Sequence, residues 1–197
     1  VLEGFAHLDL VHGALRMSNA VSAEEGQKAN YVYWCPEVFP SDIRIEWDFR
    51  PLTDTGLCML FFAATGMHGE DLFDPSLKVR NGEYSQYHHG DINAFHVSYY
   101  RRKEPDEKAL HTCNLRKSYG FYLVAQGEDP IPDTSGEGPF YHLAVEKVGE
   151  RIAFSIDDQL NFVYLDDNVT YGKRLEGGRI GFRQLAPLVA EYKNLSV

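Results

Sequence analysis

One stretch of the chain, DINAFHVSYYRRKEPDEKALHTCNLRKS (residues 91–118), gathers side chains that can bind anions and transfer protons. It contains six Lys and Arg residues, two His residues and two adjacent Tyr residues, although the formal net charge of the protein is −10. Guanidinium groups form two-pronged hydrogen bonds with carboxylates, and His and Tyr side chains act as general acids and bases. The stretch therefore predicts a site that binds an acidic ligand and can move a proton.

Alternation of residue types predicts that these polar groups share one face of a sheet. From Phe95 to Tyr99 every second residue is apolar, and successive side chains of a β-strand point to opposite faces. The predicted outward positions of this strand (92–102), of the strand that follows it and of a strand over 43–49 are His96, Ser98, Tyr100, Arg102, Thr112, Asn114, Arg116, Glu46 and Asp48. If the three strands lie in one sheet, these side chains form a single patch.

A long segment without strand periodicity, residues 65–91, precedes this stretch and is rich in Gly and Asp. Loops of this length in a compact domain are usually functional or disordered. Tyr84 and Tyr87 are candidates for stacking on a bound ligand, and His88 is a weaker candidate because loop histidines are usually plain solvent groups. We predict that the segment forms an ordered rim beside the patch.

The whole chain, residues 1–197, is predicted to form one all-β domain. Period-2 runs recur at 43–49, 92–102, 140–148, 150–157, 161–167, 178–185 and 190–197. Clusters of Gly, Asp, Asn and Pro separate them, which is typical of a sandwich or jelly roll. The apolar run LCMLFFAA (57–64) has the length of a strand that is buried on both faces.

The composition excludes several classes of protein. The excess of acidic residues argues against nucleic-acid binding and against docking on anionic membranes. No apolar run approaches the roughly 18 residues of a membrane span. An odd number of cysteines without close pairing predicts buried thiols and favours a cytoplasmic location: Cys35, Cys58 and Cys113. The chain has no G-x-S-x-G, phosphate-loop, H-E-x-x-H or C-x-x-C motif, and we expect no metal and no cofactor.

The C-terminal third resembles the concanavalin A-like lectin/glucanase jelly roll, in which two antiparallel sheets pack face to face. Its runs are HLAVEKVGERIAFSIDDQLNFVYLDD and GGRIGFRQLAPLVAEYKNLSV. More specifically, GLCMLFFAATG (56–66), GDINAFHVSYYRRK (90–103) and HTCNLRKSYGFYLVAQGEDPIP (111–132) resemble the YesU-like family of uncharacterised bacterial proteins. The resemblance covers most of the chain. It implies the same jelly roll and a link to bacterial gene clusters that degrade pectin, in particular rhamnogalacturonan, but it supplies no catalytic residues.

In this carbohydrate context the first hypothesis is a lyase that cleaves uronate-containing, pectin-type polysaccharides or oligosaccharides by β-elimination. The reaction needs a cation or amide beside the uronate carboxylate, a base for the C5 proton and an acid for the leaving oxygen. The faces assign Arg102 and Arg116 with Asn114 to the carboxylate, His96 to the base, and Tyr100 to the acid or an alternative base. No metal is required.

Three other hypotheses stay open. A lectin-like module would bind the same sugars by stacking on Tyr84, Tyr87 and Tyr100, without catalysis. A glycoside hydrolase would use Glu46 and Asp48, although carboxylates two residues apart on one strand make a poor acid/base pair across a sugar. A structural subunit would form a homodimer through the arginine-rich strand.

Overall fold

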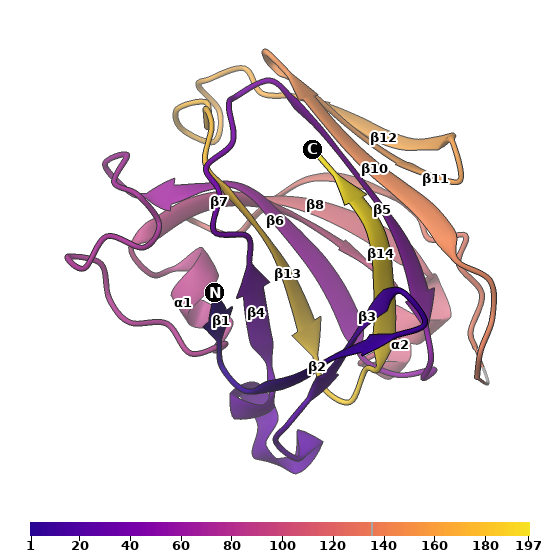
Figure 1. Ribbon diagram of the computed structural model, residues 1–197. Helices are drawn as coiled ribbons and strands as arrows, with labels where there is room; N and C mark the ends of the chain where they lie inside the picture. Colours follow the sequence, from indigo (N-terminus) through magenta and orange to yellow (C-terminus); the bar gives the residue numbers. More distant parts are fainter. Residues whose placement is uncertain (135) are drawn as a thin grey trace.

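The computed structural model describes residues 1–134 and 136–197, which form two seven-stranded antiparallel sheets packed face to face (Figure 1). Sheet A contains, in spatial order, β1 (Leu2–Glu3), β4 (Tyr31–Trp34), β13 (Arg179–Leu185), β6 (Leu57–Gly66), β7 (Ile92–Tyr99), β8 (Thr112–Ser118) and β9 (Tyr122–Glu128). Sheet B contains β12 (Gln159–Leu165), β11 (Arg151–Ile156), β10 (Tyr141–Val148), β5 (Ile43–Pro51), β14 (Ala190–Ser196), β3 (Ala14–Asn19) and β2 (Ala6–Val11). This arrangement confirms the predicted all-β sandwich.

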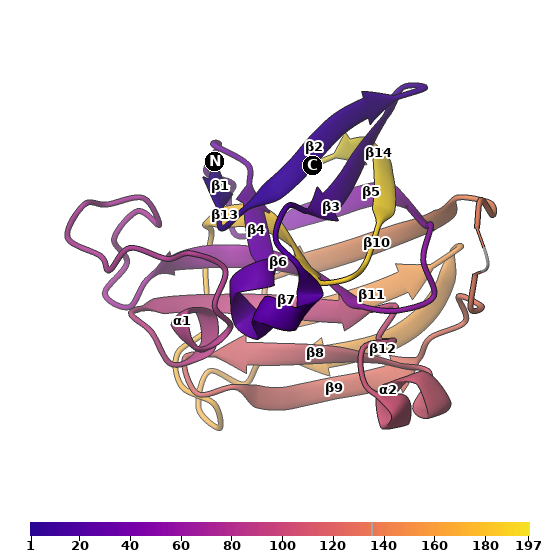
Figure 2. The same cartoon turned by 90° about the horizontal axis from the view of Figure 1, so that it is seen from below.

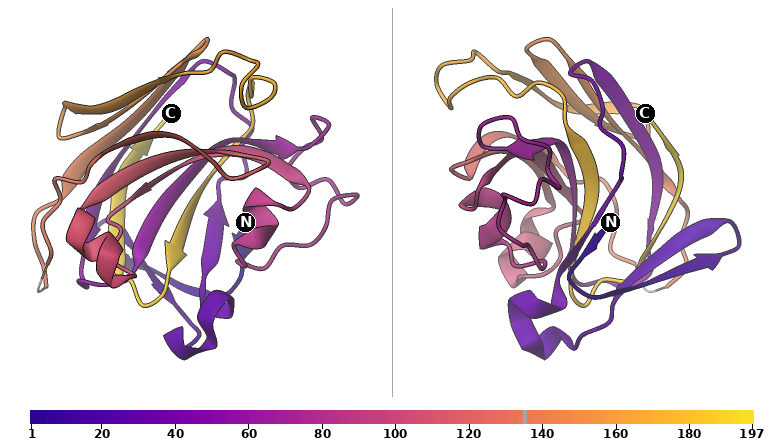
Figure 3. Two further views of the ribbon diagram at one scale, coloured as in Figure 1. Left: turned by 180° about the vertical axis from the view of Figure 1, so that it is seen from behind. Right: turned by 60° about the vertical axis from the view of Figure 1, so that its left-hand side comes forward.

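Three short helices connect strands within the described residues: η1 (Ala23–Ala29), α1 (Ser85–His88) and α2 (Pro105–Leu110). Both η1 and α1 lie on the side of sheet A that faces away from sheet B (Figures 2 and 3). The first residue of α2 is Pro105, and the side chains of Glu104 and Glu107 form a capping box that starts this helix. In the described part of the chain no helix has the length and apolar character needed to cross a membrane.

Alternate apolar side chains from the two sheets form the core. Trp47 and Phe49 of β5 contact Tyr99 of β7, with ring centroids 5.7 Å and 5.1 Å apart. Full burial of one such side chain contributes roughly 1.5–3 kcal/mol. Strand β6 lies in the middle of sheet A and is buried almost throughout, as its apolar run predicted. The three thiols are free; Cys58 and Cys113 are buried, whereas Cys35 is only half-buried.

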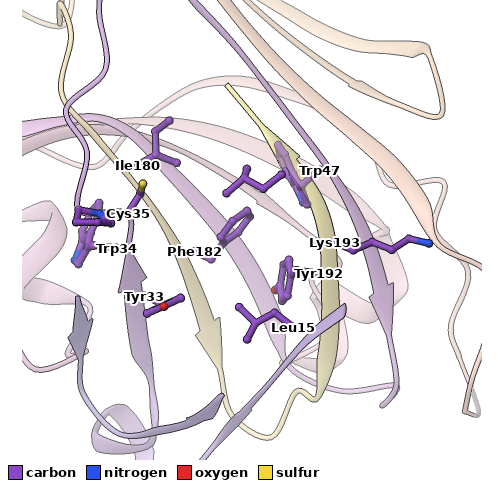
Figure 4. A pocket seen from close by; sticks show the side chains of 11 residues that line it. Leu15, Tyr33, Trp34, Cys35, Trp47, Ile180, Phe182, Tyr192 and Lys193 are labelled. Carbon is purple, nitrogen blue, oxygen red and sulfur yellow. The ribbon is translucent and has the colours of Figure 1, made fainter. Parts of the chain in front are cut away.

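An apolar cavity of about 240 Å³ lies between the sheets, where β13 faces β5 and β14 (Figure 4). Aromatic side chains such as Trp47 and Phe182 point toward it. Lys193 is the single charged residue of its lining, and the Lys193 ammonium lies 3.9 Å from the centroid of the Phe140 ring instead of inside the cavity. The lining offers no carboxylate, guanidinium or imidazole, so this gap in the core does not match the predicted site.

Candidate functional site

The predicted polar side chains that the structure brings together lie on the outer face of sheet A. Strand β7 pairs with β8 so that His96 is opposite Arg116 and Ser98 is opposite Asn114. On its other side β7 pairs with β6, which places Met59 opposite Ser98. Directly opposed side chains in an antiparallel pair have Cβ atoms about 4.5–5.5 Å apart. The four polar residues of the two strands therefore share one face, as the alternation predicted.

The predicted outward position of Tyr100 is wrong because the alternation ends at Tyr99, the last residue of β7. Tyr100 has a φ of 48°, in the left-handed region, and this turn directs its side chain into the core. The Tyr100 hydroxyl donates to the carbonyl oxygen of Thr53 at 2.9 Å. A phenol held in this way cannot act on a ligand at the outer face.

The prediction that Arg102 binds the carboxylate of a ligand is also wrong, because this side chain forms a buried ion pair. Its Nη1 donates to Asp129 Oδ2 at 3.1 Å, and its Nε donates to Asp133 Oδ1 at 2.6 Å. Its Nη2 donates to the carbonyl oxygen of Ile131 at 2.7 Å. The side chain is 1% exposed, so it cannot bind a substrate carboxylate or contact a second copy of the chain. Its neighbour Arg101 reaches the outer face instead.

Glu46 and Asp48 lie in the other sheet, so the hypothesis of a single patch with His96 is wrong for these two residues. Strand β5 pairs with β10 and β14 in sheet B. Asp48 Oδ1 is 2.9 Å from His142 Nδ1, and Glu46 Oε1 is 3.4 Å from His142 Nε2. The hydrogen bond to Asp48 raises the pKa of His142 above its ordinary value. Two carboxylates that hold one imidazole do not flank a sugar ring, which removes the geometry of the hydrolase hypothesis.

Tyr87 is a core residue and does not stack on a ligand as predicted. It is fully buried, and its hydroxyl donates to Glu3 Oε2 at 2.8 Å. Its ring contacts Trp34 and Phe61, with centroid separations of 6.5 Å and 5.5 Å. The segment 65–91 is thus anchored on the outer face of sheet A through this side chain.

Tyr84, three residues before Tyr87, covers the polar face instead. It is half-buried, and its hydroxyl oxygen is 2.9 Å from Nε2 of His96. His88 packs edge-on against the Tyr84 ring, with centroids 4.7 Å apart. His96 itself is completely buried beneath this layer. A ligand on this face therefore contacts Tyr84, while His96 can be reached only through it.

A groove of about 260 Å³ opens beside Tyr84 on this face, and we call it the basic groove. Its lining residues are Leu57, Met59, Tyr84, Ser98, Arg101, Lys103, Glu104, Glu107, Asn114, Arg116, Phe121 and Leu185. Of the residues that the sequence predicted for the site, the groove is lined by Tyr84, Asn114 and Arg116. Three cations and two carboxylates line it, together with a phenol, an amide and a hydroxyl. Such a set can bind a carboxylate and hydrogen-bond to sugar hydroxyls.

The two guanidinium groups of the basic groove are held in different ways. Arg101 Nη2 donates to Glu107 Oε1 at 2.8 Å, and Arg101 Nη1 donates to Thr112 Oγ1 at 2.6 Å. Arg116 Nη1 donates to the carbonyl oxygen of Phe121 at 3.0 Å, and its guanidinium lies 4.0 Å from the centroid of the Phe121 ring. Within residues 1–134 and 136–197, Arg116 forms no ion pair, so its charge is available to an anionic ligand.

Burial sets the protonation of the groups beside the groove. It raises the pKa of Tyr84 to about 12, against the opposing effect of Arg183. It lowers the pKa of His96 well below its ordinary value, and the charge of Arg116 acts in the same direction. Burial and the neighbouring His89 lower the pKa of His88 to about 4. Both imidazoles are therefore neutral at pH 7, and Nε2 of a neutral His96 either accepts a hydrogen bond from the Tyr84 hydroxyl or, in the other tautomer, donates one to its oxygen.

Sequence reasoning missed Arg101, Glu107 and Arg183. Arg101 occupies the outer position because the left-handed turn at Tyr100 shifts the alternation by one residue. For Arg183 a signal was available, since Ile180 and Phe182 in GRIGFRQL are the apolar positions and Arg183 falls on the opposite face. Among the described residues, no cluster of three or more His, Cys, Asp or Glu side chains is placed to hold a metal ion.

Comparisons with known proteins place the chain among proteins without an assigned activity. Residues 1–197 match the family model described as "Domain of unknown function (DUF1961)". The chain is 51% identical over 170 residues to "Uncharacterized protein YesU" of Bacillus subtilis (strain 168), which covers 86% of this chain and 77% of the relative. A solved structure from Bacillus subtilis, described as a protein of unknown function with a galectin-like fold, has a TM-score of 0.92 and 45% identity. That match covers 99% of this chain and 86% of the solved one.

The fold is also similar to that of a carbohydrate-binding module. The module, CBM66 from Bacillus subtilis, has a TM-score of 0.57 and is 14% identical, covering 96% of this chain and 89% of its own. At this identity the likeness shows the jelly-roll fold alone.

Proposed function

Because the chain belongs to the DUF1961 family, as its resemblance to the YesU-like proteins predicted, its activity must be inferred from its own site, and we propose that the basic groove acts on uronate-containing, pectin-type oligosaccharides by β-elimination. One observation carries the proposal: the hydrogen-bonded pair of Tyr84 and His96 lies beside Arg116, which has no internal ion-pair partner among the described residues. The likeness of the fold to a carbohydrate-binding module supports a sugar as the ligand.

The roles in this proposal differ from those that the sequence suggested. Arg116 and Arg101 bind the uronate carboxylate, and neutralising it makes the C5 proton more acidic. Tyr84, which lines the groove, takes the C5 proton as phenolate and returns it as phenol to the leaving oxygen, while the C4–O bond breaks and a C4=C5 double bond forms. His96 is hydrogen-bonded to the Tyr84 oxygen through Nε2 and fixes its orientation; as the Nε2–H tautomer it donates to the phenolate, and it is too deeply buried to touch a sugar.

A second candidate is a groove that binds the same oligosaccharide without cleaving it. The observation that favours it is the pKa of Tyr84, which burial raises to about 12, so that the phenolate is a minor form at neutral pH. In this case Tyr84 and Phe121 supply apolar contact to a sugar ring, and Arg116 supplies the charge.

The test is an assay of the purified chain against a panel of uronate-containing oligosaccharides, with matched neutral oligosaccharides as the control ligands. Ultraviolet absorbance reports the unsaturated uronate that β-elimination produces, and calorimetry reports binding. Tyr84→Phe removes one hydroxyl from the groove, while Tyr122→Phe removes one from an exposed ring on β9 that stacks on Tyr171.

Under the lyase proposal, turnover disappears in Tyr84→Phe, persists in Tyr122→Phe, and needs the carboxylate of the sugar. Binding without turnover in the unaltered chain supports the second candidate. Equal turnover in the two variants would refute the lyase proposal, and no preference for acidic over neutral oligosaccharides would refute the assignment of the site.

A further inference from the structure

Arg183, on the outward face of β13, is a buried cation that has no counter-ion among the residues that the structure describes. It lies opposite Met59 of β6 and Val32 of β4, and its side chain is 0% exposed. Its Nη2 donates to the carbonyl oxygen of Gly82 at 2.8 Å. Its Nε and Nη1 have no hydrogen-bond partner, and it forms no salt bridge, within the described part of the chain.

A buried, uncompensated charge is costly, so its field acts strongly on the nearest groups that can become anionic. Two phenols meet this description. The guanidinium carbon of Arg183 is 4.6 Å from the ring centroid of Tyr84 and 5.9 Å from that of Tyr87. The Tyr87 hydroxyl already donates to Glu3, whose negative charge opposes ionisation of that phenol. Tyr84 is therefore the group on which the field of Arg183 can act.

The position of Tyr84 over this cation is fixed from several sides. Its backbone N–H donates to Gln27 Oε1 of η1 at 3.2 Å, and its ring meets Phe121 edge-on with centroids 5.4 Å apart. The titratable and charged groups that face it are Arg183 from β13, Arg116 from β8, His96 from β7, Arg101 from the turn after β7, His88 from α1 and Glu107 from α2. Of these, Arg183 and His96 lie wholly beneath the groove, and because His96 is neutral, Arg183 is the charged one of the two.

We propose that Arg183 is a positioning residue that stabilises the phenolate form of Tyr84 from beneath the basic groove. The inference rests on the proposed function only for the use of that phenolate as a base. Burial raises the pKa of Tyr84, and Arg183 is the largest influence that lowers it. The same burial lowers the pKa of the Arg183 guanidinium, whereas a Tyr84 phenolate would raise it, so each of the two charges favours the other.

The experiment titrates Tyr84 in the full chain without any substrate. Carbon-13 at the Cζ of tyrosine is followed by NMR, and the Tyr84 signal is identified by its loss in Tyr84→Phe. Arg183→Met replaces the guanidinium by an apolar side chain of similar length. Replacing a buried charge by an apolar residue in this way is often neutral for stability. Arg179→Met is the matched control, since Arg179 lies on the same strand and pairs with Asp71 instead.

We expect the pKa of Tyr84 to rise in Arg183→Met, so that its signal remains that of the phenol at a pH where Tyr84 of the unaltered chain is already partly ionised, and to stay unchanged in Arg179→Met. An unchanged Tyr84 pKa in a folded Arg183→Met chain would overturn the proposal. A second measurement does not depend on the folding of that variant, because the coupling is reciprocal. In the unaltered chain the carbon-13 signal of the Arg183 Cζ must shift at the pH where Tyr84 ionises, and this step must vanish in Tyr84→Phe; its persistence there, or its absence from both, also overturns the proposal.

These outcomes are distinct from failure of the proposed function. A chain that never acts on an oligosaccharide but shows the coupled titration retains the Arg183 assignment. A chain that cleaves acidic oligosaccharides with a Tyr84 pKa independent of Arg183 retains the function and loses this inference.

Discussion

Two adjacent arginines, Arg101 and Arg102, are expected to respond to the same substitution in opposite ways. Arg102→Met leaves Asp129 without its ion-pair partner, in a site where Asp129 is 4% exposed. Breaking a buried pair by removing one partner costs about 3–5 kcal/mol. For a chain of this size that loss lowers Tm by roughly 6–20 °C. Arg101→Met breaks a more exposed pair with Glu107 and should cost less than about 1 kcal/mol.

The pH dependence of the Arg102→Met defect gives a further check on its cause. Burial already raises the pKa of Asp129 above its ordinary value, and Arg102 is the main influence that lowers it. Without Arg102 this pKa rises further, so the folded chain holds a proton at a pH where the unfolded chain has lost it. The unfavourable contribution of Asp129 is then absent below its unfolded pKa and complete above its folded pKa. The stability difference between the variant and the unaltered chain should therefore shrink as the pH falls.

The assay is urea unfolding of both variants and the unaltered chain across acidic and neutral pH, together with calorimetry of uronate oligosaccharide binding. We expect Arg102→Met to lose stability and, once folded, to keep its affinity, whereas Arg101→Met keeps its stability and loses affinity. An Arg102→Met chain of full stability that no longer binds acidic sugar would refute the reasoning. In that case Arg102 would face the ligand, as its place in the sequence suggested.

Two further predictions concern charges on the two sheets. Glu107→Gln keeps the capping box of α2 but frees Arg101, so calorimetry should show uronate affinity raised by up to about fivefold; an unchanged or weaker affinity contradicts a competing role for this carboxylate. The pKa of His142 is raised by Asp48, so its pairing stabilises the fold below the unfolded pKa of His142, and that stability is lost as the pH rises through the folded pKa. Unfolding of His142→Gln should thus differ from that of the unaltered chain at mildly acidic pH and converge with it at alkaline pH, with binding in the groove unaffected.

Local alternation predicts the parts of this site that depend on neighbouring residues alone. It placed His96 and Ser98 on one face of β7 because that strand keeps its period from Ile92 to Tyr99. It failed at Tyr100, where a left-handed residue exchanges the faces expected of Arg101 and Arg102, and no residue type at that position signals the turn. The pairing of strands depends on residues that are far apart in the chain. Nothing in 43–49 therefore indicated that β5 pairs with β10 and β14 in the other sheet.

The choice between Tyr84 and Tyr87 illustrates a second limit. Both lie in a segment without strand period, and the helix that begins after Tyr84 and contains Tyr87, α1, has four residues, too few to show a helical pattern. Which ring enters the core depends on Glu3, more than eighty positions away in the chain, whose carboxylate accepts the Tyr87 hydroxyl. The sequence could therefore name an aromatic rim but could not say which ring faces the ligand.

A formal net charge of −10 is compatible with a basic groove, because dissolved salt limits the distance over which exposed charges interact. At physiological ionic strength exposed charges more than about 8 Å apart are largely screened, so an anion in the groove responds mainly to the local charges. These are Arg101, Lys103, Arg116 and the buried Arg183, opposed by Glu104 and Glu107. The volume of the groove then limits the ligand. At about 260 Å³ it is just below the roughly 300–1,000 Å³ of sites that enclose drug-sized ligands, so under the proposed function we expect it to hold one or two sugar rings with their carboxylates at a time. A short oligosaccharide also brings fewer charges toward the acidic remainder of the surface, which favours fragments over the intact polysaccharide.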